Sequence, residues 1–202
     1  MFITIALIAL TCAISFPCFQ NRGLLDRLLF WPPAVNRGEY WRLVTHGFVH
    51  ADGQHLLFNM VTLFFFGRAI EGFFERYIGV AGFALFYLAA IVVAILPSYL
   101  RHKNDSRYRS LGASGAVSAV LFAYILIAPW STIYVFFFPI PAILYAILFT
   151  AYGFYATRLG HDHINHSAHL WGAGFGLLFT LCMEPRIGPI FLERLMQPGF
   201  GG

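Results

Sequence analysis

This chain contains six long apolar segments, each bounded by charged residues, Pro or Gly. They cover residues 2–19, 55–69, 79–100, 114–128, 139–156 and 168–183. A helix that crosses the hydrocarbon core of a bilayer needs about 20 predominantly apolar residues. Charged residues make up 11% of the 202 residues, against about 25% in soluble domains. We therefore predict an all-α polytopic membrane protein, with six transmembrane helices in one domain over residues 1–202.

The segments differ in their ends and in the loops between them. No Lys or Arg precedes residues 2–19 and the segment has no clear cleavage site, so we expect a retained span rather than a signal peptide. Residues 20–54 form a long first loop, and a long ordered loop in a small bundle is usually functional. Two of the shorter segments begin with polar residues, which favours helices that are shielded inside the bundle and open to a wet cavity.

The charge balance favours contact with lipid over contact with nucleic acid. The net charge is +4, but the basic residues are scattered except in the loop 101–113. A basic loop beside a bilayer is typical of contact with anionic headgroups. The three cysteines show no spacing of a metal site and are interpreted as small apolar residues. We expect membrane lipid as a partner, no nucleic acid and no metal.

Polar residues begin every second segment. Consecutive spans alternate in direction, so the starts of the second, fourth and sixth spans open on the same face of the membrane. These starts carry His55 and Asn59, then Ser114, then His169. His55 and Asn59 are four residues apart and therefore share one face of a helix. A hydroxyl, two imidazoles and an amide at similar depth predict a functional site.

Small residues surround the serine and follow the histidine. Ser114 lies in the run Gly112-Ala113-Ser114-Gly115, and Gly172 and Gly176 follow His169. Each pattern alone is typical of close helix packing. Serine becomes a nucleophile when an adjacent base accepts its proton. The coincidence of a glycine-flanked serine and a histidine at one depth therefore favours catalysis over packing alone.

Taken in order, these residues resemble the rhomboid family of intramembrane serine proteases. The resemblance extends from about residue 40 to residue 176. Its motifs are Tyr40-Trp41-Arg42, His46, His50, the run from His55 to Asn59, the run from Gly67 to Glu71, the run from Gly112 to Gly115, and His169 with Gly172 and Gly176.

The resemblance implies a serine endopeptidase that cuts transmembrane segments of other membrane proteins and needs no cofactor. Ser114 is then the nucleophile and His169 the general base, without an acidic third member. His55, Asn59 and the backbone N–H of Ser114 are expected to stabilise the oxyanion. The remaining matches are expected to be structural or to line the cavity: Trp41 and Arg42 in the first loop, His46 and His50, Glu71 as an anchor of that loop or its neighbours, and Gly112, Gly115, Gly172 and Gly176 at close approaches.

Two observations depart from the family pattern. Several members carry a tyrosine four residues after the serine that stacks on the catalytic histidine, and this chain has Ser118 there. The family places the N-terminus in the cytoplasm, which puts most Lys and Arg residues outside, against the usual bias. We nevertheless expect the family orientation, and a bacterial plasma membrane as the location. The identity of the substrate proteins and the oligomeric state are not predicted.

Other functions remain as alternatives. A relative that binds membrane helices without cutting them needs neither Ser114 nor His169, yet both are present. A membrane metalloenzyme is suggested by the spacing of His46 and His50, and by the cluster His161, His163 and His166. A transporter or channel has no support, because the sequence shows no internal repeat.

Overall fold

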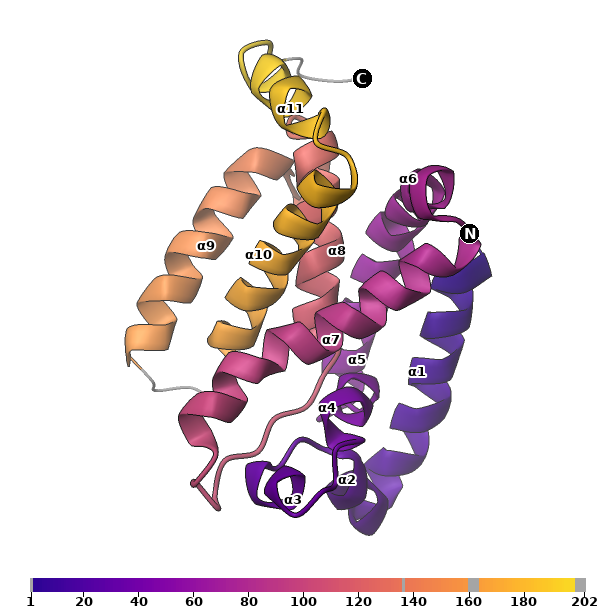
Figure 1. Cartoon of the computed structure of the whole chain (residues 1–202), viewed down its shortest axis with the longest axis vertical. Coiled ribbons are helices and arrows are strands. Elements are labelled where there is room, and N and C mark those ends of the chain that lie inside the picture. The colour runs from indigo at the N-terminus through magenta and orange to yellow at the C-terminus, as the bar shows by residue number, and fades with distance from the viewer. Residues whose placement is uncertain (1, 136, 160–163, 199–202) are drawn as a thin grey trace.

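The computed structural model describes residues 2–135, 137–159 and 164–198, which are mostly helical (Figure 1). The elements are α1 (Phe2–Gln20), α2 (Arg22–Leu28), α3 (Pro32–Asn36), α4 (Arg42–Thr45), η1 (His46–Phe48), α5 (Gly53–Thr62), η2 (Leu63–Gly67), α6 (Arg68–Ile78), α7 (Val80–His102), α8 (Ser114–Ile127), β1 (Thr132–Val135), β2 (Phe138–Pro141), α9 (Ala142–Leu159), α10 (His166–Met183) and α11 (Ile187–Leu195). The predicted all-α class is confirmed, with one short β-hairpin added to it.

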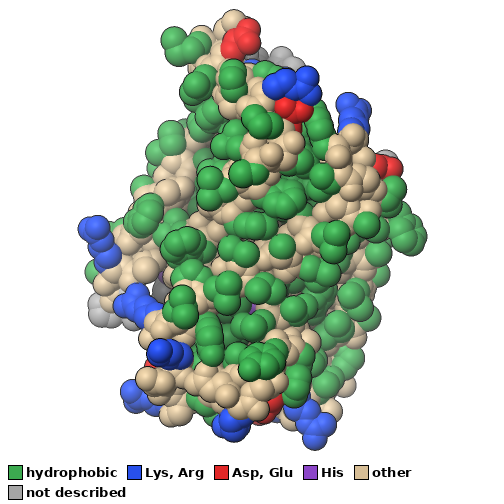
Figure 2. Space-filling model, in the orientation of Figure 1, with side chains coloured by type: hydrophobic (Ala, Val, Ile, Leu, Met, Phe, Trp, Pro, Cys, Tyr) green, Lys and Arg blue, Asp and Glu red, His purple; other side chains and the backbone are tan. Residues whose placement is uncertain are grey.

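Four helices of the described chain are long and apolar enough to cross a membrane alone. They are α1, the continuous helix Gly53–Ile78, α7 and α9. The α10 helix is long and apolar enough only when it is taken together with α11, and the chain bends by 116° between these two helices. Length and composition thus identify four spans, or five if the bent pair is one span, and α8 is a further, shorter apolar helix. The count of six spans stays a prediction. Figure 2 shows hydrophobic side chains over most of one face, as expected for contact with lipid.

The helix α8 lies in the interior of the bundle. It contacts α7, α9 and α10, and 11 of its 14 residues are buried. Fourteen residues span only about 21 Å of helix, less than the ~30 Å of a hydrocarbon core. A helix can be this short because protein, rather than lipid, covers its ends. Its first residue, Ser114, is half-buried at the start of this interior helix.

Two glycines allow α10 to pass against the backbone of α8. A Cβ atom at Gly172 would overlap the carbonyl oxygen of Gly115, and a Cβ at Gly176 would overlap that of Ala119. Small residues with this spacing let two helices approach closely. The close crossing brings the start of α10 beside the start of α8.

The second span is longer than the predicted 55–69. The Asp52 carboxylate accepts the His55 backbone N–H at 2.8 Å and caps the start of the helix. The helix continues through a π-helical segment and past Glu71 to Ile78. The predicted span ended at the first charged residues. The helix continues past them because another helix donates hydrogen bonds to the buried Glu71 carboxylate.

That element is the beginning of α1. The Glu71 carboxylate accepts the backbone N–H groups of Ile3 and Thr4, each at 2.9 Å, and the Thr4 hydroxyl at 2.6 Å. The first N–H groups of a helix lack partners within the helix, and a carboxylate placed there satisfies them. Glu71 thus holds a neighbour of the first loop, the helix α1, rather than the loop itself.

The fifth span begins later than the predicted residue 139. Residues Phe138–Pro141 form β2, which pairs antiparallel with β1, and α9 begins only at Ala142. Pro139 and Pro141 lack a backbone N–H, so they suit a short exposed strand better than the interior of a helix. The helix then extends to Leu159 instead of ending at residue 156, and α10 begins at His166 instead of residue 168.

The long first loop is folded into short helices, α2 to α4 and η1 (Figure 1). The guanidinium of Arg42 donates to the carbonyl oxygens of Asp26 at 2.6 Å and Leu29 at 2.8 Å, and to the Glu39 carboxylate at 2.7 Å. The neighbouring Trp41 indole N–H donates to the Arg27 carbonyl at 3.4 Å. A buried arginine with three acceptors fixes the loop as one unit.

Candidate active site

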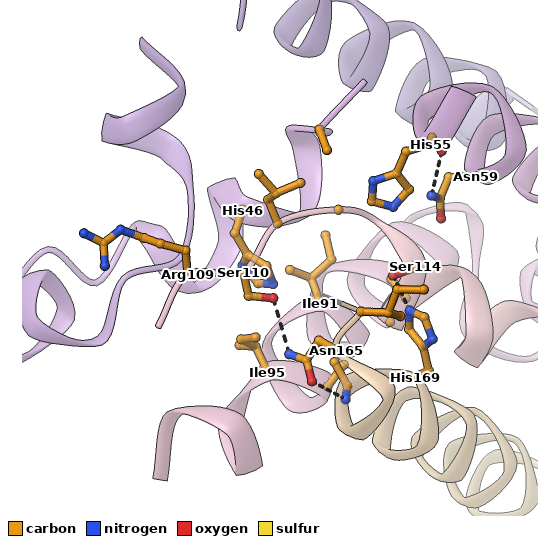
Figure 3. Close-up of a pocket in the computed structure, with 18 of the residues that line it drawn as sticks. His46, His55, Asn59, Ile91, Ile95, Arg109, Ser110, Ser114, Asn165 and His169 are labelled. Atoms are coloured by element: carbon orange, nitrogen blue, oxygen red, sulfur yellow. Dashed lines mark hydrogen bonds between the residues drawn. The ribbon is translucent and has the colours of Figure 1, made fainter. Parts of the chain in front are cut away.

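A cavity of about 480 Å³ lies where the starts of three helices meet (Figure 3). His55 and Asn59 come from α5, Ser114 from α8 and His169 from α10, and all four line the cavity. The structure thus brings together the four polar residues that the alternation of spans predicted at one depth. Their catalytic roles remain predictions.

Ser114 and His169 lie within hydrogen-bonding distance. The Ser114 Oγ is 2.7 Å from His169 Nε2. With the imidazole proton on Nδ1, the hydroxyl donates to Nε2, which is the arrangement a general base requires. The close crossing of α8 and α10 at Gly172 sets this distance, because Gly172 lies one turn after His169.

Aromatic rings flank His169 within the described residues. The ring of Phe149, from α9, is nearly parallel to the imidazole at a centroid distance of 6.1 Å and an angle of 28°. The His166 ring approaches edge-on at 6.0 Å and 81°. The family tyrosine position, Ser118, is buried in α8 and carries no ring. The sequence did not indicate which ring takes the place of the family tyrosine, because Phe149 lies on another helix.

His55 and Asn59 lie on the same side of the cavity, separated from His169 by Ser114 in Figure 3. The Asn59 side chain is buried, and its amide donates to the His55 carbonyl oxygen at 2.9 Å. The backbone at Gly112 passes directly against the His55 ring, where an added Cβ would lie 2.7 Å from Cε1. Gly112 also has φ +114°, a conformation that other residues rarely adopt. The loop before Ser114 therefore needs glycine for two reasons.

His50 does not line the cavity, and of the two roles expected for it, structural or cavity-lining, its contacts are those of a structural residue. Its side chain is fully buried, and its Nε2 accepts the Ala113 backbone N–H at 3.3 Å. The Ser15 hydroxyl donates to the Phe48 carbonyl, so it accepts from His50 Nδ1 at 3.0 Å. Both ring nitrogens are thereby assigned to the neutral form. His50 connects α1 to the residue that precedes Ser114.

His46 does line the cavity, although the residue as a whole is only 5% exposed. Its Nδ1 lies 3.0 Å from the Arg42 carbonyl oxygen, and its own carbonyl accepts the Gly112 backbone N–H at 2.9 Å. His46 therefore connects the first loop to residues 103–113, the loop before α8, which we call the serine loop. The first loop thus supports the serine loop.

Asn165 is a site residue that sequence reasoning missed. Its side-chain oxygen accepts the Ala168 backbone N–H at 3.0 Å and the Ser98 hydroxyl at 3.1 Å. Its amide donates to the Ser110 hydroxyl at 3.3 Å (Figure 3). Asn165 thus caps α10 and holds its start against α7 and the serine loop. An asparagine before an apolar run is a known helix-start signal, which could have identified it.

The histidine clusters form no candidate metal site in the part of the chain that the structure describes. No group of three His, Cys, Asp or Glu side chains there could hold an ion. His46 and His50 each use Nδ1 for contacts within the protein. His161 and His163 lie outside the described residues.

Burial of the two loop histidines makes stability depend on pH. Burial lowers the pKa of His46 to about 4, and burial together with the nearby His55 lowers the pKa of His50 to about 3. Between these values and the unfolded pKa of about 6.5 the unfolded chain binds more protons, so the free energy of unfolding falls as the pH falls. We expect a loss of up to about 1.4 kcal/mol per pH unit for each histidine.

Denaturant unfolding in detergent micelles at pH values from 7.5 to 5 measures this effect. The His50→Gln variant, which lacks one titrating ring, is expected to show a shallower slope than the wild type. An unfolding free energy that does not change between pH 7.5 and 5 would contradict the prediction.

Comparisons with known proteins identify the family of this chain. Residues 37–186 match the Rhomboid domain family. The chain is 36% identical over 169 residues to RHOMBOID-like protein 12, mitochondrial, of Arabidopsis thaliana, covering 77% of this chain and 50% of that protein. It is 29% identical to the putative rhomboid protease YdcA of Bacillus subtilis strain 168, covering 75% and 72%.

A third relative matches over most of both chains. The rhomboid protease GlpG of Haemophilus influenzae is 29% identical over 181 residues, covering 88% of each protein. The chain spans about half the length of the Arabidopsis relative. The family match includes every residue of the candidate site, from His46 to His169. The chain is an integral membrane protein and belongs to the rhomboid family.

Proposed function

We propose that this chain is an intramembrane serine endopeptidase that uses Ser114 as nucleophile and His169 as general base. The observation that carries the proposal is the 2.7 Å contact between Ser114 Oγ and His169 Nε2, in a cavity enclosed by apolar helices. The relatives named rhomboid proteases support the same activity. A protein that only binds membrane helices has no use for a serine aligned with a base.

The reaction follows from this geometry. His169 Nε2 accepts the Ser114 proton as Oγ attacks the peptide carbonyl, and an acyl-enzyme forms when the protonated imidazole gives that proton to the leaving amine. Water then attacks the ester as His169 accepts its proton, and the imidazole returns that proton to Ser114 Oγ as the acyl C–O bond breaks and the carboxyl product leaves. The polar lining of the cavity, which includes His46 and Asn59, supports the entry of that water. No cofactor takes part in the proposed steps.

The negative charge that develops on the attacked carbonyl needs donors fixed in advance. We assign this role to His55, the Asn59 amide and the backbone N–H of Ser114. The first N–H groups of α8 have no acceptor within their own helix, and the helix dipole favours negative charge there. The Asn59 amide has a second N–H besides the one bonded to the His55 carbonyl.

Removing one of these donors should reduce kcat by about 10²- to 10³-fold. We expect this loss for Asn59→Ala and for His55→Ala, with little change in KM, because the donors act on the transition state. Gln54→Ala, an exposed neighbour on the same helix, is the matched control and should retain the wild-type rate. A fall in kcat of less than threefold for both variants would remove His55 and Asn59 from the proposed oxyanion site.

The proposed substrates are transmembrane segments of other proteins. A peptide bond in a helix has its carbonyl hydrogen-bonded, so the segment must unwind before Ser114 attacks. We expect small or helix-breaking residues near the cleaved bond. We propose that the substrate enters beside α9. Only 22% of the residues of α9 are buried inside the protein, the lowest share among the four candidate spans.

We also propose that the N-terminus is cytoplasmic, that the cavity opens to the outer face and that the membrane is a bacterial plasma membrane. Most basic residues then lie outside, against the usual bias. Several of them are used within the folded loops: Arg42 is buried, and Arg37 and Arg109 lie over the Trp31 ring at 4.9 and 4.3 Å. Labelling of single cysteines at exposed loop positions in intact cells tests this orientation.

The activity is tested with single-span proteins reconstituted together with the wild-type chain in vesicles. Mass spectrometry of the products should locate the cut inside the span, and the Ser114→Ala variant should give no product. Co-purification without cleavage by the wild type would instead support the helix-binding alternative.

A further inference from the structure

We propose that Phe149 of α9 is a positioning residue for His169, so that the orientation of the base depends on how α9 is seated in the bundle. This inference rests on the proposed function, since it concerns the same dyad. The helix α9 then contributes to the alignment of Ser114 and His169, although no motif of the sequence indicates this role.

The contact between the two rings carries the inference. The centroids of Phe149 and His169 are 6.1 Å apart, and the planes differ by 28°. Aromatic rings interact favourably at centroid distances of about 4.5–7 Å in offset arrangements. An imidazole that bonds to serine through Nε2 can still rotate about its side-chain bonds, and a ring beside it limits that rotation. Phe149 therefore helps to keep Nε2 directed at Ser114.

Phe149 is itself held in place from two sides. The Phe122 ring from α8 lies 5.4 Å away, and the Tyr145 ring, one turn earlier on α9, lies 5.6 Å away. Phe149 is therefore not a loose lipid-facing ring but part of the contact between α8 and α9. The helix that carries the nucleophile and the helix beside the base are joined through it.

A second contact from α9 supports the same arrangement. Tyr152 lies three residues after Phe149 and therefore on the same face of the helix. Its ring forms a T-shaped pair with His166 at a centroid distance of 5.4 Å, and His166 forms a T-shaped pair with His169 at 6.0 Å. Two neighbouring rings of α9 thus contact the two histidines at the start of α10. Ser118, on α8, offers no ring for this purpose.

The position of these rings has a mechanical consequence. Large apolar side chains of α9, among them Ile147, Leu148 and Phe154, are exposed on its outer side, as expected for a helix that borders lipid. Motion of α9 away from α10 would carry Phe149 off the imidazole. The position of α9 in the bundle therefore affects the alignment of Ser114 and His169.

The test separates alignment of the base from access of the substrate. Phe149→Leu keeps an apolar side chain but removes the ring, Phe149→Tyr keeps the ring, and Phe154→Leu is a matched control on the exposed side of α9. The first readout is the rate at which a small fluorophosphonate labels Ser114 between pH 6 and 9, because this probe needs no helix to enter. The second is kcat and KM for a transmembrane substrate.

We expect Phe149→Leu to slow labelling about three- to tenfold, the range that corresponds to one aromatic contact. Its pH profile of labelling should also shift, and kcat should fall while KM changes little. Phe149→Tyr and Phe154→Leu should label within about twofold of the wild type. If Phe149→Tyr labels as slowly as Phe149→Leu, the inference is contradicted, because Phe149→Tyr keeps the ring and loss of the ring would not be the cause.

Another result would also overturn the inference. If Phe149→Leu labels at the wild-type rate and only its KM or its cleavage rate changes, Phe149 acts in packing or access and not on the base. Absence of labelling in the wild type would contradict the proposed function instead, so the two failures are distinguishable.

Discussion

Substitution of Ser114 or His169 by alanine is expected to reduce cleavage by at least about 10³-fold. The two groups act as one unit, because the hydroxyl is activated only through the imidazole 2.7 Å away. The double variant should therefore be no less active than Ser114→Ala alone. Initial rates of cleavage of a reconstituted transmembrane substrate measure all three variants.

Ser118→Ala is the matched control for the serine. Ser118 lies one turn later on the same helix and is buried, so the substitution makes a similar change without touching the dyad. We expect it to keep nearly the full rate. A His169→Ala variant that cleaves at more than a tenth of the wild-type rate would show that another group acts as the base.

The second large effect is expected from Gly172. Its replacement by leucine places a side chain where the carbonyl of Gly115 already lies, so α10 must move away from α8. A misplacement of about 1 Å in an active site can cost about 10²-fold in rate. We expect Gly172→Leu to insert into the membrane but to lose at least that much activity.

Gly174 provides the control on the same helix. A Cβ at Gly174 would meet no atom within 4 Å, so Gly174→Leu adds the same side chain at a position with open space. It should retain nearly wild-type cleavage and similar expression. Full activity of Gly172→Leu would show that the close crossing of α8 and α10 does not set the dyad.

The candidate site could be predicted from sequence because its residues come at the starts of alternating spans. Direction of crossing alone places His55, Ser114 and His169 on one face, and the structure brings them into one cavity. The spacing of Gly172 and Gly176 indicated a close helix contact, but not which backbone atoms they would meet.

Other parts depended on contacts between distant segments and could not be predicted. The second helix continues past Arg68 because α1 satisfies Glu71, a contact 67 residues apart in sequence. The sequence left His50 as either structural or cavity-lining, and only its contacts with Ser15 and Ala113 place it in the interior. The support of His169 by Phe149 crosses from one span to another. Periodicity within a span carries no information on such pairs.

The Ser114–His169 dyad is tested by labelling the detergent-solubilised chain with a fluorophosphonate probe in the presence of a chelator. We expect the wild type to be labelled at Ser114, and Ser114→Ala and His169→Ala to remain unlabelled. Absence of labelling in folded wild-type protein, or equal labelling of His169→Ala, would contradict a serine activated by that histidine.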